Sequence, residues 1–225
     1  WTGDVRMREW NKPRYAPYRR ADNFKMPFWL QPERIYVGAA WYQRDVVIPP
    51  DWQGKHIVLR LERPHWETTV WVDSRKISSC ESLSTPHVYD LSNALSPGKH
   101  KLTIRVDNRM IVNVGPNAHS VTDHTQSNWN GLAGDIELVA TSPVWIEDIQ
   151  VYPDAGQKRA KVVATIGNMT GQTSNGELQF QAVDAQDRPA IAVALPYRVA
   201  GERTTIEATL DLGPHALLWD EFDPN

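Results

Sequence analysis

The sequence lacks the features that several large classes of function require. Among 225 residues there is a single cysteine, Cys80, which excludes an internal disulfide. Its neighbours in SCESL include no histidine or asparagine at the spacing of an activated thiol, so a small structural cysteine is the favoured interpretation. No apolar run of about 18 residues occurs, and the chain therefore predicts no membrane span.

An excess of positive charge is also missing. The chain has 24 Lys and Arg residues against 27 Asp and Glu residues, a net charge of -3 and an isoelectric point near 6.2. A surface that binds nucleic acid needs a basic stripe to neutralise phosphates. We therefore expect no nucleic-acid partner.

Long amphipathic helical stripes are absent, and alternation with a period of two residues takes their place. In KLTIRVDN the apolar Leu102, Ile104 and Val106 alternate with polar residues, as in a half-buried strand. The same pattern recurs in HIVLRLERP, GDIELVA, RAKVVATIGN and RTTIEATLDL. Turns rich in Gly, Pro, Asp and Ser separate these segments, and one helical turn is expected at 91–95 with Asp90 or Ser92 as its cap. The pattern predicts an all-β sandwich or barrel.

A break near Thr141-Ser142-Pro143 divides the chain, because a proline follows one apparent strand and a new apolar segment begins after it. We expect a first β-sandwich at 1–143 and a second at 144–212, where five strand candidates suit a small immunoglobulin-like domain. Residues 213–225 are expected to form a linker.

Several motif blocks occur in the same order as in a known family. They are AWYQRDVVIPPDW, ETTVWVDSRKI, YDLSNALSPGKHKLTIRVDN and NWNGLAGDIELVATSPVWIEDIQVYP. Together they resemble the sugar-binding domain of glycoside hydrolase family 2, which includes β-galactosidases, β-glucuronidases and β-mannosidases. LLWDEFDPN at 217–225 is similar to the segment through which the family's immunoglobulin-like domain continues into a catalytic barrel.

The resemblance implies a jelly-roll, galactose-binding-like sandwich and then an immunoglobulin-like one, with the chain's own C-terminal barrel as partner and a β-linked carbohydrate as its ligand. Retaining hydrolysis needs two carboxyl groups about 5 to 5.5 Å apart. The family's acid/base glutamate follows an asparagine, and the sequence has no Asn-Glu dipeptide. We therefore expect no catalytic residue, no cofactor and no turnover by this chain alone. Oligomeric state stays open, and the expected location is the periplasm or exterior of a bacterial cell, although the opening WTGDVRMREW shows no signal peptide.

A polar stretch before the last block is the candidate sugar contact. In the family an acidic residue precedes this strand, whereas here Thr125 stands at that position. The stretch still gathers side chains suited to hydrogen bonding and stacking with a sugar. The predicted substrate-binding residues are Asp123, His124, Gln126, Asn128, Trp129 and Asn130. The alternative is a polar connection whose side chains cap turns, with Trp129 in the core.

Metal binding and aromatic stacking are the weaker functional interpretations. His119, Asp123 and His124 match no standard zinc spacing, so no metal site is expected. Large aromatics mostly fill sandwich cores, and core packing is expected for Trp41, Trp52, Trp66, Trp71 and Trp145. The charged side chains of ERPHWE favour a salt-bridged loop or a domain contact.

Two other functions remain open beside a non-catalytic part of a glycosidase. One is an autonomous carbohydrate-binding module, which the richness in tryptophan and the jelly-roll pattern suit. The other is a structural β-protein, which leaves the LLWDEFDPN ending unexplained.

Overall fold

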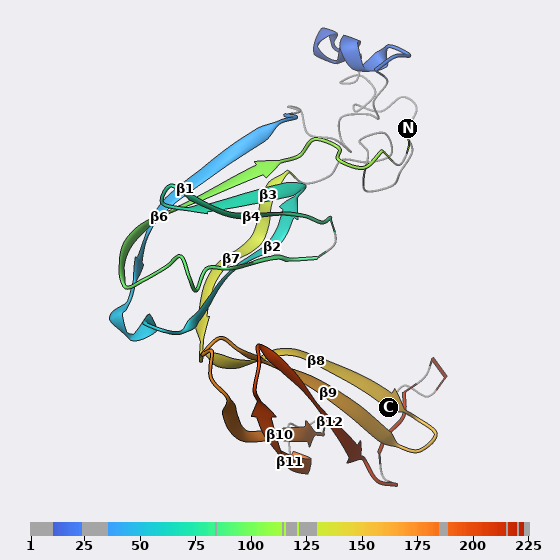
Figure 1. Ribbon diagram of the computed structural model, residues 1–225. Coiled ribbons are helices and arrows are strands. Elements are labelled where there is room, and N and C mark those ends of the chain that lie inside the picture. Colours follow the sequence, from blue (N-terminus) through green and yellow to red (C-terminus); the bar gives the residue numbers. More distant parts are fainter. Residues whose placement is uncertain are drawn as a thin grey trace. The chain divides into compact units, whose positions relative to one another are not determined.

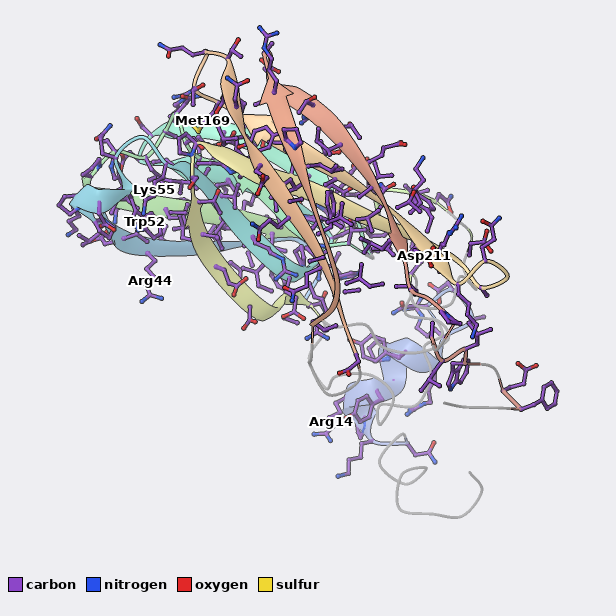
Figure 2. All side chains as sticks on the ribbon, turned by 90° about the horizontal axis from the view of Figure 1, so that it is seen from below. Arg14, Arg44, Trp52, Lys55, Met169 and Asp211 are labelled. Atoms are coloured by element: carbon purple, nitrogen blue, oxygen red, sulfur yellow. The ribbon has the colours of Figure 1, made fainter. Side chains whose placement is uncertain are left out.

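The computed structural model describes residues 11–23, 36–83, 85–113, 115, 121, 130–184, 189–214, 216–219 and 221–222. Nearly all regular structure is β, which confirms the all-β prediction (Figure 1). Two short 3-10 helices, η1 (Pro13–Arg19) and η3 (Pro50–Trp52), are the exceptions among these residues. No helix in the described part is long and apolar enough to cross a membrane.

Contacts divide the chain into two compact units. One comprises Trp1–Gln53 and Ile57–Val139, and the other comprises Gly54–His56 and Ala140–Asn225. The first unit has two sheets, ordered β1-β6-β3-β4 and β5-β2-β7. Its strands are β1 (Ala39–Ile48), β2 (His56–His65), β3 (Glu67–Val72), β4 (Arg75–Glu81), β5 (His87–Asp90), β6 (Gly98–Asp107) and β7 (Gly131–Thr141).

The central strand β6 shows why the first sheet forms. Leu102, Ile104 and Val106 are 6%, 4% and 2% exposed, as their alternation predicts. Strands β1 and β3 pair antiparallel with the two edges of β6, so β6 lies inside the sheet. Its apolar row packs in the core, and its alternate residues form the middle of the sheet's outward face.

A short turn connects β5 to β6 at the predicted position. The amides of Ala94 and Leu95 donate to the carbonyl of Leu91, at 2.8 and 2.9 Å. Asp90 Oδ1 accepts from the Ser92 amide at 2.8 Å, so Asp90 is the cap. Ser92 Oγ instead accepts from the Ile57 amide on β2 at 2.9 Å, which joins the turn to the neighbouring strand.

The first core also contains a polar chain of hydrogen bonds. His87 Nε2 lies 3.1 Å from the Ser82 carbonyl, which can only accept, so Nε2 carries the proton. His87 Nδ1 then accepts from Thr68 Oγ1 at 2.6 Å, and Thr68 Oγ1 in turn contacts the Tyr89 hydroxyl. While His87 is neutral, each of these side chains has a hydrogen-bond partner. Burial accordingly lowers the pKa of His87 and raises that of Tyr89 to about 12.

The second unit has a three-stranded sheet, β12-β9-β8, and a two-stranded sheet, β10-β11. Its strands are β8 (Val144–Asp154), β9 (Arg159–Asn168), β10 (Ser174–Val183), β11 (Pro189–Val199) and β12 (Arg203–Asp211). The core combines side chains from both sheets, among them Val162, Ala164, Ile166, Leu178, Phe180, Val199, Ala208 and Leu210. Each unit therefore has a hydrophobic core of its own.

Aromatic side chains cover glycines across two strand pairs of this unit. Trp145 on β8 pairs with Gly167 on β9, and Tyr197 on β11 pairs with Gly176 on β10. A Cβ on Gly167 would lie 2.8 Å from Trp145 Cη2 and closer to two other ring atoms. The missing side chain is thus what lets the indole lie against the neighbouring strand.

Candidate functional site

Only one of the six predicted sugar contacts, Asn130, belongs to the described part of the chain. The other five, Asp123, His124, Gln126, Asn128 and Trp129, lie outside the described residues, as do Thr125 and His119. Asn130 directly precedes β7, and the residue that mainly fixes its position is Asn108, which directly follows β6. The structure therefore describes the two residues that flank the intervening segment.

The Asn108 side chain ties three segments together. Its Nδ2 donates to the Tyr36 carbonyl and to Asn130 Oδ1, both at 2.6 Å, and its Oδ1 accepts from the Gly38 amide at 2.7 Å. Tyr36 and Gly38 precede β1, so the residues before β1, after β6 and before β7 meet at one amide group. The sequence alone does not predict this role, because an asparagine after a strand shows nothing of partners 70 residues away.

A charged cluster lies next to Asn108. Asp107 is 5% exposed, and Arg109 Nε donates to Asp107 Oδ1 at 2.9 Å. Arg105 pairs with Glu67 on β3 and lies 3.8 Å from Asp107 Oδ2. Hydrogen bonds from Arg109 lower the pKa of Asp107 to about 2 despite its burial. Asp107 is therefore a fixed anion that anchors Arg109, unsuited to proton transfer near neutral pH.

A glycine fixes the start of β7. Gly131 has a φ of 80°, which side chains disfavour, and a Cβ there would lie 2.5 Å from the Tyr42 hydroxyl of β1. The chain thus turns sharply between Asn130 and β7 and passes close to β1. This turn and the Asn108 hydrogen bonds together hold Asn130 at the rim of the first unit, the place where the residues before β1, after β6 and before β7 meet.

The other acidic side chains near this rim have structural partners. Glu62 pairs with Arg63 at 3.2 Å and accepts from the Asp135 amide at 2.8 Å. The charged side chains of ERPHWE thus form ion pairs within the first unit, in keeping with the salt-bridged interpretation. In the described ranges, no group of three His, Cys, Asp or Glu side chains could hold a metal ion.

Cys80 on β4 fits a structural role. It is partly buried, and its burial together with the nearby Glu81 raises the pKa of the thiol. A raised pKa leaves less of the nucleophilic thiolate at neutral pH.

The tryptophans divide between core and surface. Trp66 is 6% exposed, which confirms its predicted core position, and Trp52, Trp71 and Trp145 are partly buried. For Trp41 the prediction is wrong, because this side chain is 60% exposed. Trp41 pairs with Arg105 of β6, whose side chain is on the outward face of the sheet, so the register turns the indole away from the core.

Comparison with known proteins gives one consistent result. Residues 2–143 match the family described as glycosyl hydrolases family 2, sugar binding domain. A β-glucuronidase of Paenibacillus borealis is 24% identical over 66% of this chain, and the human β-glucuronidase is 26% identical over 55%. The chain covers only 31% and 23% of those proteins, so it spans a third or less of their length.

Solved structures agree with the fold. A β-glucuronidase of Bacteroides uniformis matches 78% of this chain with a TM-score of 0.67 at 18% identity, and the chain covers 22% of it. A family 2 glycosyl hydrolase of Bacteroides cellulosilyticus matches 91% with a TM-score of 0.67 at 18% identity, and the chain covers 27% of it. The sequence match over most of the first unit decides the family: this chain belongs to glycosyl hydrolase family 2 and carries the family's sugar binding domain.

Proposed function

We propose that the chain is a non-catalytic part of a retaining family 2 glycosidase, in which it scaffolds the catalytic domain and brings the segment between Asn108 and Asn130 to the border of the sugar pocket. The observation that carries the second half of this proposal is the set of hydrogen bonds made by Asn108. They hold both ends of a segment rich in polar side chains at one rim of the first unit. A segment fixed at both ends is suited to present side chains to a ligand.

The lack of catalytic groups supports the non-catalytic half of the proposal. The sequence has no Asn-Glu dipeptide. The buried carboxylate at the rim, Asp107, is held by arginine with a pKa of about 2, so it cannot serve as a general acid. The relatives are much longer than this chain, which leaves ample length in them for a catalytic domain.

We further propose the domain division 1–143 and 144–212, with an immunoglobulin-like second domain and a linker at 213–225. The second unit's five strands in two sheets and its separate core support this division. For the substrate of the whole protein, the relatives' names favour a β-glucuronide among β-glycosides.

Two measurements test the proposed function. The purified chain should release no nitrophenol from p-nitrophenyl β-glucuronide, β-galactoside or β-mannoside, and turnover that persists through repeated purification would overturn the non-catalytic assignment. The coding sequence downstream of Asn225 should encode a barrel with an Asn-Glu acid/base and a second glutamate. A reading frame that closes without one would refute the scaffolding role.

A further inference from the structure

The outward face of the sheet β1-β6-β3-β4 carries two neighbouring indole rings. Trp41 on β1 pairs with Arg105 of β6, and Trp71 on β3 pairs with Thr103 of β6. The two tryptophans therefore lie diagonally on either side of β6. Their ring centroids are 5.3 Å apart, and the ring planes are tilted by 35°.

The two indoles differ in how far they are exposed to solvent. Thr103 lies on the outward face between the tryptophan positions, yet it is only 6% exposed. Trp71 is partly buried, whereas Trp41 keeps 60% of its surface exposed. Trp41 therefore presents an exposed indole on a strand, with a second indole beside it, so the two rings together form a small aromatic surface.

Polar side chains on the same face of the sheet flank the two indoles. Gln43 Nε2 donates to Thr103 Oγ1 at 3.0 Å, which fixes the amide two residues along β1 from Trp41. On the opposite flank, Arg105 and Glu67 form an ion pair in which each side chain is 29% exposed. These groups can both donate and accept hydrogen bonds, as a sugar hydroxyl requires of its partners.

The charged side chains around the rings are held in ion pairs. Asp45 is paired with Lys99 at 2.8 Å and with Lys101 at 2.9 Å, and Glu67 is paired with Arg105. A face with aromatic rings, fixed polar groups and charges that already have ion-pair partners complements a hydroxyl-rich partner that carries no charge of its own. A pyranose has such a chemistry, because it combines an apolar C–H face with a ring of hydroxyl groups.

We propose that this face, formed by Trp41, Trp71, Gln43, Arg105 and Glu67, is a binding platform for a neutral β-linked oligosaccharide. One sugar ring stacks on the exposed face of Trp41, and its hydroxyl groups bond to Gln43 and to the Arg105–Glu67 pair. The platform is formed by sheet residues and includes none of the residues between Asn108 and Asn130. It gives this chain a glycan-binding activity that needs no catalytic domain.

The test is calorimetric titration of the whole 225-residue chain with cellohexaose, β-1,4-mannohexaose, β-1,4-galactohexaose and, as an anionic arm, hyaluronan hexasaccharide. We expect saturable binding of at least one neutral hexasaccharide. Trp41→Ala should weaken it by about tenfold or more, since the stacking surface is removed. The matched control is Trp219→Ala, which removes an indole that is 71% exposed at another place and should change the affinity less than about twofold.

Circular dichroism and unfolding of Trp41→Ala confirm that the variant is folded, and Trp41→Phe, which keeps a ring, should recover part of the affinity. No binding of any neutral hexasaccharide up to millimolar concentration, or equal losses in Trp41→Ala and Trp219→Ala, would overturn the platform. Binding of the anionic hexasaccharide alone would also overturn it. A glycan-binding chain without turnover leaves the proposed function intact, and so does a chain that binds nothing, so the two proposals fail separately.

Discussion

At the scale of single residues, Asn108 is the described side chain that joins three segments at the candidate site. Replacing it with alanine removes three hydrogen bonds and leaves the Gly38 amide and the Tyr36 carbonyl without their partner. We expect Asn108→Ala to lower the free energy of unfolding by roughly 1 to 3 kcal/mol. Urea unfolding would measure this loss.

A second asparagine provides the control for that variant. Asn93 lies exposed in the turn between β5 and β6. Asn93→Ala should change stability by less than about 0.5 kcal/mol. Equal effects of the two substitutions would show that Asn108 has no special role in joining the three segments.

His87 should make the first unit sensitive to acid. Its pKa is lower in the folded chain than in the unfolded chain, so the unfolded state binds more protons as the pH falls below the ordinary value near 6.5. The stability contributed by neutral His87 is thus present above that pH and is lost as the pH falls through the lowered pKa of the folded state. His87→Gln, which can still hydrogen bond but does not titrate, should flatten this part of the stability profile.

His100 offers a comparison with the opposite sign. Its hydrogen bond to Asp73 raises the pKa of the imidazole, so its contribution is present at low pH and is lost as the pH rises through the folded pKa. Urea midpoints of the wild type, His87→Gln and His100→Gln between pH 5 and 8 would separate the two effects. If the wild type loses stability towards acid pH and His87→Gln loses it to the same extent, the role given to His87 is contradicted. The carboxylates contribute in another window, because Asp107, with a pKa of about 2, loses its contribution only below about pH 4.

At the scale of strands, the cross-strand pair of Trp145 and Gly167 makes β8 and β9 depend on a missing side chain. Gly167→Ala would force the indole out of its position, and we expect a loss of roughly 1 to 3 kcal/mol, typical of overpacking. Gly201→Ala is the matched control, because a Cβ there meets nothing within 4 Å. Thermal unfolding of both variants tests this, and a neutral Gly167→Ala would show that the indole moves at no cost.

Alternation in the sequence predicted strands well and burial less well. It placed β6 and β12 correctly because their apolar rows face a second sheet. It also suggested a buried Ile136 on β7, whose side chain is in fact 52% exposed, and Ile149 on β8 is 54% exposed. Both lie on strands at the edge of a sheet, and edge position depends on strand order, which local pattern does not contain.

The candidate site was predictable only in outline. The order of motif blocks identified the polar stretch before β7, and Asn130 does lie at the rim. The Asn108 contacts and the exposure of Trp41 depend on pairing between strands far apart in sequence, so no local spacing could predict them. All six predicted sugar contacts stay predictions, and five of them fall outside the described residues.

At the scale of the whole chain, two separate cores predict two cooperative transitions. In scanning calorimetry, Asn108→Ala should lower the midpoint of one transition by about 2 to 4 °C per kcal/mol lost, and Gly167→Ala should lower the other. Variants that move one and the same transition would show that the chain unfolds as a single unit, and would contradict the proposed domain division.

The hydrogen bond between Asn108 and Asn130 also bears on how the protein could change over evolution. It joins two residues 22 positions apart, so one side-chain contact closes the chain between them at its ends. Each doubling of such a loop costs only about 0.6 kcal/mol of closure entropy. Closure entropy therefore sets little limit on the length of this segment as long as Asn108 is kept.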